Sequence, residues 1–297
     1  MLSRRSFLVS AGAGAAAGSL VSSISFAAGN KIPLGIQLWT VKAEAEKDLE
    51  GTLKKLYALG FREIEFAGYY QRSAADLGKL VKGIGLTPTS THAGADLIAS
   101  SGDQVIADAK TLGLKYIICS SPMTPKPEKA KLEWGKKMEA LDLDDWKANA
   151  ELFNKFGKQV KDAGMTFGYH NHYTEFKKFG EKMGYTELMA NTDPNLVKIE
   201  MDIGWVVAAR QDPLALLNKY KGRVVALHVK DVGKLADDPH QSTTTALGEG
   251  TIDYKKVIGA AYAQGVRHYF YEQEEPYTRP IFESAKISAD YLSKLSV

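Results

Sequence analysis

One local pattern recurs along the chain: an amphipathic helical stretch, then a glycine, then a short run of apolar residues. A glycine accepts the left-handed conformation that ends a helix, and an uninterrupted apolar run is typical of a strand buried in a parallel sheet. The glycine of this pattern recurs at Gly60, Gly85, Gly113, Gly164, Gly222 and Gly265. We therefore expect six junctions at which a helix ends and a buried strand begins.

Two further apolar runs complete the expected set of strands: residues 34–39, and residues 196–202 after the break at Asp193 and Pro194. The expected strands end near Trp39, Phe66, His92, Cys119, His170, Asp202, His228 and Glu272. Between the strands, apolar residues recur at helical spacing. They include Leu49, Leu53 and Leu56, and again Trp146, Ala150 and Phe153.

Strands that alternate with helices predict an α/β fold with a parallel sheet and right-handed crossovers. Eight such units match a (β/α)8 TIM barrel, which takes about 250 residues. An open doubly wound sheet is the alternative, but the Gly-x-Gly-x-x-Gly pattern of a dinucleotide fold does not follow the first strand. The longest insert, residues 122–143, is expected to form a loop over the mouth of the barrel with a short helix.

The first residues have the features of a twin-arginine (Tat) export signal. Arg4 and Arg5 precede a short stretch of small and apolar residues, and Ala27 ends a small-x-small cleavage pattern. The alternative is a membrane anchor, but the stretch is short for a span of about 20 residues. We expect a signal peptide at 1–27, a single barrel domain at 28–297, a periplasmic location, and membrane contact only during export.

Composition narrows the possible partners and ligands. Lys and Arg number 38 against 35 for Asp and Glu, which gives a formal net charge of +3 and no basic stripe for nucleic acid. The hydrophobic share of 44% is that of a globular protein rather than a disordered one. The single cysteine, Cys119, can form neither an intrachain disulfide nor a thiolate cluster, so any metal must be bound by histidines and carboxylates.

The polar residues that can carry chemistry gather at the expected strand ends. In a TIM barrel the loops after the strands form the concave active face. Side chains at matching heights on adjacent strands converge there, so Asp202, His228 and Glu272 can form a mixed oxygen and nitrogen shell for a divalent cation. Glu65 and Glu200 fit a supporting carboxylate and a structural ion pair equally well.

From Leu34 onward the chain resembles the sugar phosphate isomerase/epimerase family, with the xylose isomerase-like TIM barrel of the AP endonuclease 2 superfamily. The motifs that carry the resemblance are residues 169–176 (YHNHYTEF), 202–213, 222–231, 248–253 and 272–273. The resemblance implies one divalent metal ion (Mn, Co, Mg or Zn) bound by a strand-five carboxylate, an Asp, a His and a Glu. The last three correspond to Asp202, His228 and Glu272.

Strand five departs from the family pattern. The epimerases of this family have a glutamate where His170 stands, and that glutamate acts with the strand-eight glutamate in proton transfer. Either His170 or Glu175 can take its place as the metal ligand, and we favour Glu175 because the Glu-Phe that closes the motif suggests a carboxylate held by an anchored aromatic residue. The departure affects the two-glutamate mechanism rather than the metal itself.

Such a site predicts an isomerase or epimerase, or a lyase or dehydratase, that works through a metal-bound enediolate of a sugar, keto-sugar or inosose. Glu272 or His170 would act as base, His172 would transfer a proton, and Lys230 would offset negative charge on the substrate oxygen. The residues expected to bind the substrate are Trp39, Tyr70, His92 and Trp205. The alternative is a catalytically silent carbohydrate-binding barrel that partners an oxidoreductase.

Overall fold

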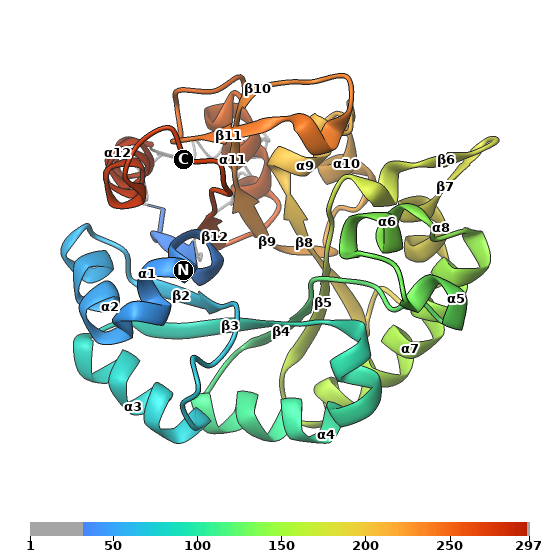
Figure 1. The fold of residues 1–297 in the computed structure, drawn as a ribbon, viewed down its shortest axis with the longest axis horizontal. Coiled ribbons are helices and arrows are strands. Elements are labelled where there is room, and N and C mark those ends of the chain that lie inside the picture. Colours follow the sequence, from blue (N-terminus) through green and yellow to red (C-terminus); the bar gives the residue numbers. More distant parts are fainter. Residues whose placement is uncertain (1–31, 296–297) are drawn as a thin grey trace, which may run out of the picture. The chain divides into compact units, whose positions relative to one another are not determined.

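Eight strands close into a barrel in the computed structural model, which describes residues 32–295 (Figure 1). Their spatial order is β1-β12-β9-β8-β5-β4-β3-β2, and each pairs with its neighbours in parallel. The barrel strands are β1 (Gly35–Gln37), β2 (Glu63–Phe66), β3 (Thr87–Ala93), β4 (Tyr116–Cys119), β5 (Thr166–His170), β8 (Val197–Asp202), β9 (Val224–Val229) and β12 (His268–Tyr271). This is the predicted TIM barrel; the expected signal peptide lies outside the described residues.

All six junction glycines have positive φ angles, between 76° and 101°. Residues with a Cβ adopt this left-handed conformation only at a cost, which is why glycine stands at these positions. Each glycine is followed within three residues by a barrel strand, so the predicted helix-to-strand junctions are confirmed.

Helices form the layer outside the strands (Figure 1). They are α1 (Lys42–Lys47), α2 (Leu49–Ala58), α3 (Ala74–Ile84), α4 (Ala95–Leu112), α7 (Leu143–Asp162), α8 (Gly184–Ala190), α9 (Ile203–Ala208), α10 (Pro213–Lys219), α11 (Tyr254–Ala263) and α12 (Ile281–Lys294). The apolar residues predicted on α2 and α7, such as Leu53 and Phe153, are fully buried against the sheet. Among the residues described, no helix is long and apolar enough to cross a membrane.

The remaining elements lie in the connections between strands and helices. They are η1 (Leu38–Val41), α5 (Pro127–Ala130), α6 (Trp134–Glu139), η2 (Thr174–Phe176), β6 (Lys178–Phe179), β7 (Lys182–Met183), β10 (Asp231–Lys234), η3 (Pro239–Gln241) and β11 (Thr243–Thr245). The insert at 122–143 therefore contains two short helices rather than one. Two small antiparallel sheets, β6-β7 and β10-β11, follow the fifth and seventh barrel strands.

Four of the expected strand ends differ from the structure; β3 and β9 each run one residue further than expected, to Ala93 and Val229, whereas β1 and β12 stop earlier. β1 ends at Gln37, whose side chain accepts a hydrogen bond of 3.1 Å from the backbone N–H of Trp39 and so begins η1. Trp39 consequently lies in a helical turn rather than in the strand. β12 ends at Tyr271, and Glu272 is the first residue beyond it.

The register of the strands builds the site in two layers. His170 pairs with Glu200, and Asp202 pairs with His228. Because side chains alternate along a strand, Glu200 and Asp202 lie on the same face of β8, at successive heights in the barrel. One group of ionisable side chains lies at the height of Glu200, and a second group lies at the height of Asp202.

Candidate active site

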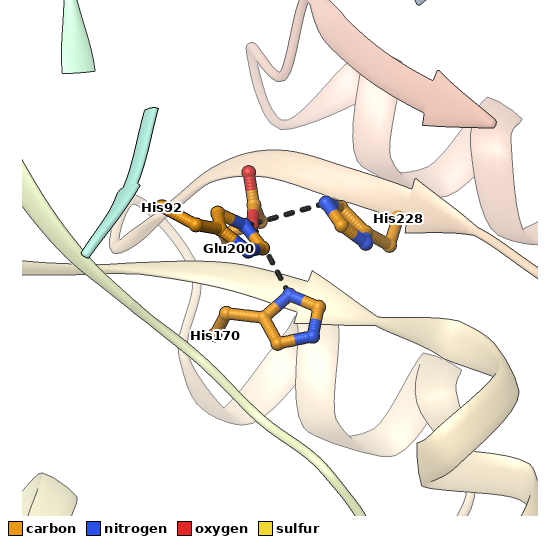
Figure 2. A group of neighbouring side chains, drawn as sticks. All are labelled: His92, His170, Glu200 and His228. Carbon is orange, nitrogen blue, oxygen red and sulfur yellow. Dashed lines mark hydrogen bonds and ion pairs between the residues drawn. The ribbon is translucent and has the colours of Figure 1, made fainter. Parts of the chain in front are cut away.

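The first group, here called the imidazole cluster, consists of Glu65, His92 and Glu200 and adjoins His170 and His228. Glu200 Oε2 lies 2.9 Å from His92 Nε2, 3.1 Å from His170 Nδ1 and 3.2 Å from His228 Nε2. Figure 2 shows the three imidazole rings arranged around this carboxylate. One carboxylate oxygen therefore serves three histidines from three different strands.

Glu65 supports the same cluster from β2. Its Oε1 lies 2.6 Å from His228 Nε2 and 3.0 Å from His92 Nε2. The amide of Gln37 donates to Oε1 at 2.8 Å, and the hydroxyl of Ser90 donates to Oε2 at 2.5 Å. Glu65 is fully buried and is held in place through both oxygens.

The second group, here called the lysine cluster, consists of Asp202, Lys230, Glu272 and Glu274. The Lys230 ammonium lies 2.8 Å from Asp202 Oδ2 and 2.9 Å from Glu272 Oε2, and it also donates to Glu274 Oε1. It is only 1% exposed and lies 4.8 Å from the centre of the Trp205 ring. Burial disfavours the charged form of Lys230, but the neighbouring carboxylates outweigh this effect and raise its pKa. Lys230 therefore remains a positively charged ammonium at neutral pH.

His170 and His228, the shared histidines, separate the two clusters. His228 turns Nε2 toward Glu65 and Glu200, and its Nδ1 lies 2.8 Å from Glu272 Oε2. His170 turns Nδ1 toward Glu200, and its Nε2 lies 3.9 Å from Asp202 Oδ2. Each ring therefore presents one nitrogen to each cluster.

The charges of the histidines differ because their neighbours differ. Burial opposes the charge of His228, but Glu200, Glu272 and Glu65 outweigh burial and hold its pKa well above its usual value. Burial lowers the pKa of His170, and the positive charge on His228 lowers it further. Burial and then Lys230 lower the pKa of His172 to about 4, so this imidazole is neutral at pH 7.

A cavity of about 680 Å³ opens above both clusters, within the size range of small-molecule sites. Its polar floor includes His92, His170, His172, Glu272 and Glu274. Its aromatic wall includes Trp39, Tyr173, Trp205 and His240. None of the described residues of the 122–143 insert lines this cavity; Ser242 and Thr244, from the β10-β11 region, do so instead.

Two buried polar atoms of the aromatic wall lack a hydrogen bond. The Tyr173 hydroxyl and Trp205 Nε1 have no partner within the part of the chain that the structure describes. Buried polar groups normally find partners, so these two atoms are suited to hydrogen bonds with a bound ligand. Their rings lie 5.3 Å apart, centre to centre.

Two sets of side chains have donor atoms close enough to hold one metal ion. The first comprises His92, His170, Glu200 and His228, and the second comprises His170, Asp202, His228 and Glu272, with all donors of each set within 4.8 Å of one another. The structure thus brings together Asp202, His228 and Glu272, and it places His170 beside them. Imidazole and carboxylate donors suit a divalent transition metal, so the residues present fit such an ion.

Glu175, the other strand-five alternative, belongs to neither set among residues 32–295. Its Oε1 accepts from the Tyr169 hydroxyl at 2.8 Å and from the backbone N–H of His172 at 2.9 Å, and Oε2 accepts from Thr174 at 3.0 Å. Burial raises its pKa against these hydrogen bonds. The turn after β5 thus directs this carboxylate toward Tyr169, while His170 faces the cavity.

Of the expected substrate-binding residues, Trp39, His92 and Trp205 line the cavity, whereas Tyr70 is not among the described residues that line it. Tyr70 has a φ of 50° and its hydroxyl donates to the Leu38 carbonyl at 3.5 Å, in a separate hollow. Sequence reasoning did not identify three participants: Gln37, Ser90 and Glu274. Ser90 lies two residues before His92 on β3, so the period of that strand is the signal that could have found it. Glu274 lies beyond β12, and Trp39, the expected residue nearest to Gln37, lies in a helical turn, so neither Gln37 nor Glu274 had this signal.

Comparison with known proteins agrees with this geometry. Residues 53–295 match the family described as xylose isomerase-like TIM barrel. An inosose dehydratase from Geobacillus thermodenitrificans is 25% identical over 291 residues, which covers 89% of this chain and 97% of that protein. The crystal structure of a sugar phosphate isomerase/epimerase from Parabacteroides distasonis has a TM-score of 0.74 at 26% identity, covering 89% of this chain and 98% of the other.

A more distant barrel shares the fold alone. The crystal structure of a xylose isomerase-like TIM barrel protein from Mycobacterium smegmatis, in complex with magnesium, has a TM-score of 0.63 at 15% identity, covering 89% of this chain and 96% of the other. The family match spans most of the chain, and the inosose dehydratase from Geobacillus thermodenitrificans aligns over 97% of its length. The chain therefore belongs to the xylose isomerase-like TIM barrel family and is an enzyme.

Proposed function

We propose that the enzyme removes water from a polyhydroxylated ketone, such as an inosose or a keto-sugar, through an enediolate. The observation that carries this proposal is the buried Lys230 ammonium, held by Glu272, which lines the cavity together with the neutral His172. The full-length likeness to an inosose dehydratase supports dehydration over isomerisation or epimerisation, which share the same first step.

The first step needs a base and a stabiliser of negative charge. His172 accepts the proton from the carbon next to the carbonyl, because its low pKa keeps the imidazole neutral at pH 7. The electron pair of the broken C–H bond moves to the carbonyl oxygen, whose negative charge the Lys230 ammonium stabilises. Glu272, the base expected from the sequence, has Oε2 engaged by both His228 and Lys230, so we assign it to hold the ammonium.

The second step expels the hydroxyl from the next carbon. The electron pair returns from the oxygen to form the double bond, the C–O bond breaks, and His172 gives its proton to the departing hydroxyl. Carbon loses one proton and one hydroxide, so the products are water and an unsaturated ketone. The Tyr173 hydroxyl and Trp205 N–H would bind other hydroxyls of the ring.

We propose one divalent ion (Mn, Co, Mg or Zn) as cofactor, bound by the shared histidines with carboxylates of an adjoining cluster. The chemistry that such an ion supplies is polarisation of the substrate carbonyl. The sequence-derived ligand set for it is Asp202, His228 and Glu272 with His170 or Glu175. Of the two strand-five alternatives, His170 is supported by its position within 4.8 Å of the other donors.

The test is incubation of the metal-loaded protein with 2-keto-myo-inositol and with 3-keto-glycosides in heavy water, followed by mass spectrometry. We expect 2-keto-myo-inositol to lose one water, and one or more of these ketones to take up deuterium beside the carbonyl. His172→Gln should lower both rates by about 10²–10⁴-fold, as expected for loss of a general base. Failure of every ketone to exchange or lose water would refute the proposal.

Export by the Tat pathway to the periplasm is a separate proposal, supported by the residues before Ala28 alone. Replacing Arg4 and Arg5 together by Lys should retain the precursor in the cytoplasm. Fractionation of cells that express the full chain, with immunodetection of both sizes, measures this. Unchanged release of a shortened chain would contradict it.

A further inference from the structure

The shared histidines decide which cluster can hold a metal ion. A neutral imidazole has one nitrogen with a lone pair, and its other nitrogen carries a proton. His170 and His228 each face the imidazole cluster with one nitrogen and the lysine cluster with the other. Each ring can therefore ligate an ion on one side only and must donate a hydrogen bond on the other.

The lysine cluster already contains a cation. Lys230 Nζ lies within 2.9 Å of both Asp202 Oδ2 and Glu272 Oε2, two of the oxygens that an ion on this side would need. The other oxygen of Asp202 accepts from the backbone N–H of Trp205 at 2.8 Å and caps α9. An ion at this position would have to displace a buried ammonium from its carboxylates.

The imidazole cluster contains donors of the right kind at the right spacing. Its three histidine nitrogens lie 2.9 to 3.2 Å from Glu200 Oε2. Two donors on one ion, each about 2.1 Å from it, are separated by about 3.0 Å at a right angle and about 3.4 Å in a tetrahedron. The three distances from Glu200 Oε2 to the histidine nitrogens therefore fit a coordination shell, and all four donors lie within 4.8 Å of one another.

The negative charge of the imidazole cluster also favours a metal ion at this position. Across residues 32–295, the ion-pair partners of Glu65 and Glu200 are imidazoles, and no Lys or Arg approaches either carboxylate. Glu200 is fully buried, and its Oε1 has no hydrogen-bond partner in that same stretch. Two buried carboxylates and a free carboxylate oxygen favour a divalent cation at this position.

We propose that the metal site of this enzyme is the imidazole cluster, with His92 Nε2, His170 Nδ1, His228 Nε2 and Glu200 as ligands. The set expected from the sequence, Asp202 and Glu272 with His228, instead holds Lys230. In this arrangement His228 Nδ1–H donates to Glu272 Oε2 and connects the ion to the carboxylate that positions the ammonium. A shell of three imidazoles suits Zn²⁺, Co²⁺ or Mn²⁺ better than Mg²⁺.

The test measures metal binding without substrate, so its outcome is independent of the proposed dehydration. The purified full chain is titrated with Co²⁺ and with Zn²⁺, and stoichiometry, affinity and the visible Co²⁺ spectrum are recorded. Two ligand variants, His92→Asn and Glu200→Gln, are compared with two matched variants of the lysine cluster, Asp202→Asn and Glu272→Gln. Circular dichroism and thermal unfolding check that each variant folds.

We expect about one ion per wild-type chain and a loss of affinity of at least about 100-fold in the first pair, because a ligand is removed. In the second pair the loss should stay within the 10–100-fold range of supporting residues, with the Co²⁺ spectrum preserved. His92→Asn decides the matter if Glu200→Gln does not fold, since His92 lies at the cavity floor and is 13% exposed. The reverse order of losses, or no binding by the wild type, would overturn the proposal.

Discussion

The imidazole cluster and the lysine cluster flank the same two histidines but balance their negative charge in different ways. In the lysine cluster, three carboxylates surround an ammonium that remains charged at any physiological pH. In the imidazole cluster, the ion-pair partners of the two carboxylates within residues 32–295 are imidazoles, whose charge depends on a proton or a metal ion. The charge balance of the lysine cluster is thus set by its own lysine, whereas that of the imidazole cluster depends on the proton or metal ion that binds there.

The two clusters also differ in their access to substrate. Glu272 and Glu274 of the lysine cluster line the cavity, and the Glu274 side chain is 26% exposed. Glu65 and Glu200 are fully buried beneath it. Two carboxylates of the lysine cluster therefore reach the cavity, whereas His92 is the member of the imidazole cluster that does so among the described residues.

The largest effect is expected for His228→Ala, because His228 is the residue that both clusters share. Its removal takes one imidazole from Glu65, which keeps His92, and one from Glu272, which keeps Lys230, and breaking a buried pair costs up to about 3–5 kcal/mol. We expect turnover of the ketone to fall by at least about 10³-fold together with this loss of stability. Urea unfolding and steady-state kinetics measure the two effects; activity within tenfold of wild type would show that the clusters act independently.

Lys230→Met would remove the ammonium that distinguishes the lysine cluster from the imidazole cluster. Three carboxylates would then lack their ammonium, and turnover should fall by about 10²–10³-fold as the stabiliser of the enediolate is lost. Divalent ions should now bind the lysine cluster as well, so metal stoichiometry should rise above that of the wild type. Lys230→Arg, which keeps the charge, is the control; equal stoichiometry in Lys230→Met and wild type would contradict the role given to the ammonium.

The fold could be predicted from the sequence because its signals are local and repeated. Each junction glycine, from Gly60 to Gly265, marks a helix end through its positive φ angle. The apolar run that follows each glycine forms a strand of the buried sheet. Asp202 and His228 could be placed for a related reason: they lie within or at the ends of strands, where the period of two fixes their direction.

The contacts of Lys230 and the direction of Glu175 could not be predicted in this way. Glu272 and Glu274 lie beyond the end of β12, where no strand period orients a side chain, so their convergence on Lys230 is a tertiary result. Glu175 lies in a helical turn, and hydrogen bonds to Tyr169 and to the backbone of His172 decide its direction. Such bonds depend on packing that a linear pattern does not contain.

Trp205→Phe is a smaller change, and it tests whether the aromatic wall of the cavity donates a hydrogen bond to the substrate. The phenyl ring keeps an aromatic face over Lys230 but loses the buried N–H that we assign to a substrate hydroxyl. One lost hydrogen bond of about 0.5–1.5 kcal/mol predicts a rise in KM of about 2–12-fold. Tyr173→Phe removes the neighbouring donor and should behave alike; unchanged kinetics in both variants would exclude these atoms from substrate binding.

The smallest effect on stability is expected for substitution of Asp142, which forms an exposed lysine–carboxylate pair, in contrast to the buried pairs of Lys230. Asp142 also meets two lysines, at 2.5 Å from Lys126 and 2.8 Å from Lys129, but its side chain is 40% exposed. It caps α7 by accepting from the backbone N–H groups of Asp144 and Asp145, each at 3.1 Å. Because solvent screens its charge, Asp142→Asn should cost at most about 1 kcal/mol of unfolding free energy, and Asp142→Ala about 1 kcal/mol more through loss of the cap.

The pH dependence of this effect has a definite sign. Hydrogen bonds from Lys126 and Lys129 hold the pKa of Asp142 below its usual value of 3.8. A carboxyl whose folded pKa is depressed contributes stability in full above the unfolded pKa and loses it as pH falls below that value. The stability difference between wild type and Asp142→Asn should therefore be constant from about pH 7 to pH 5 and shrink below about pH 4. Urea unfolding across this range measures it, with catalytic activity near neutral pH unchanged because Asp142 is remote from both clusters; a difference that grows in acid would contradict the assigned ion pairs.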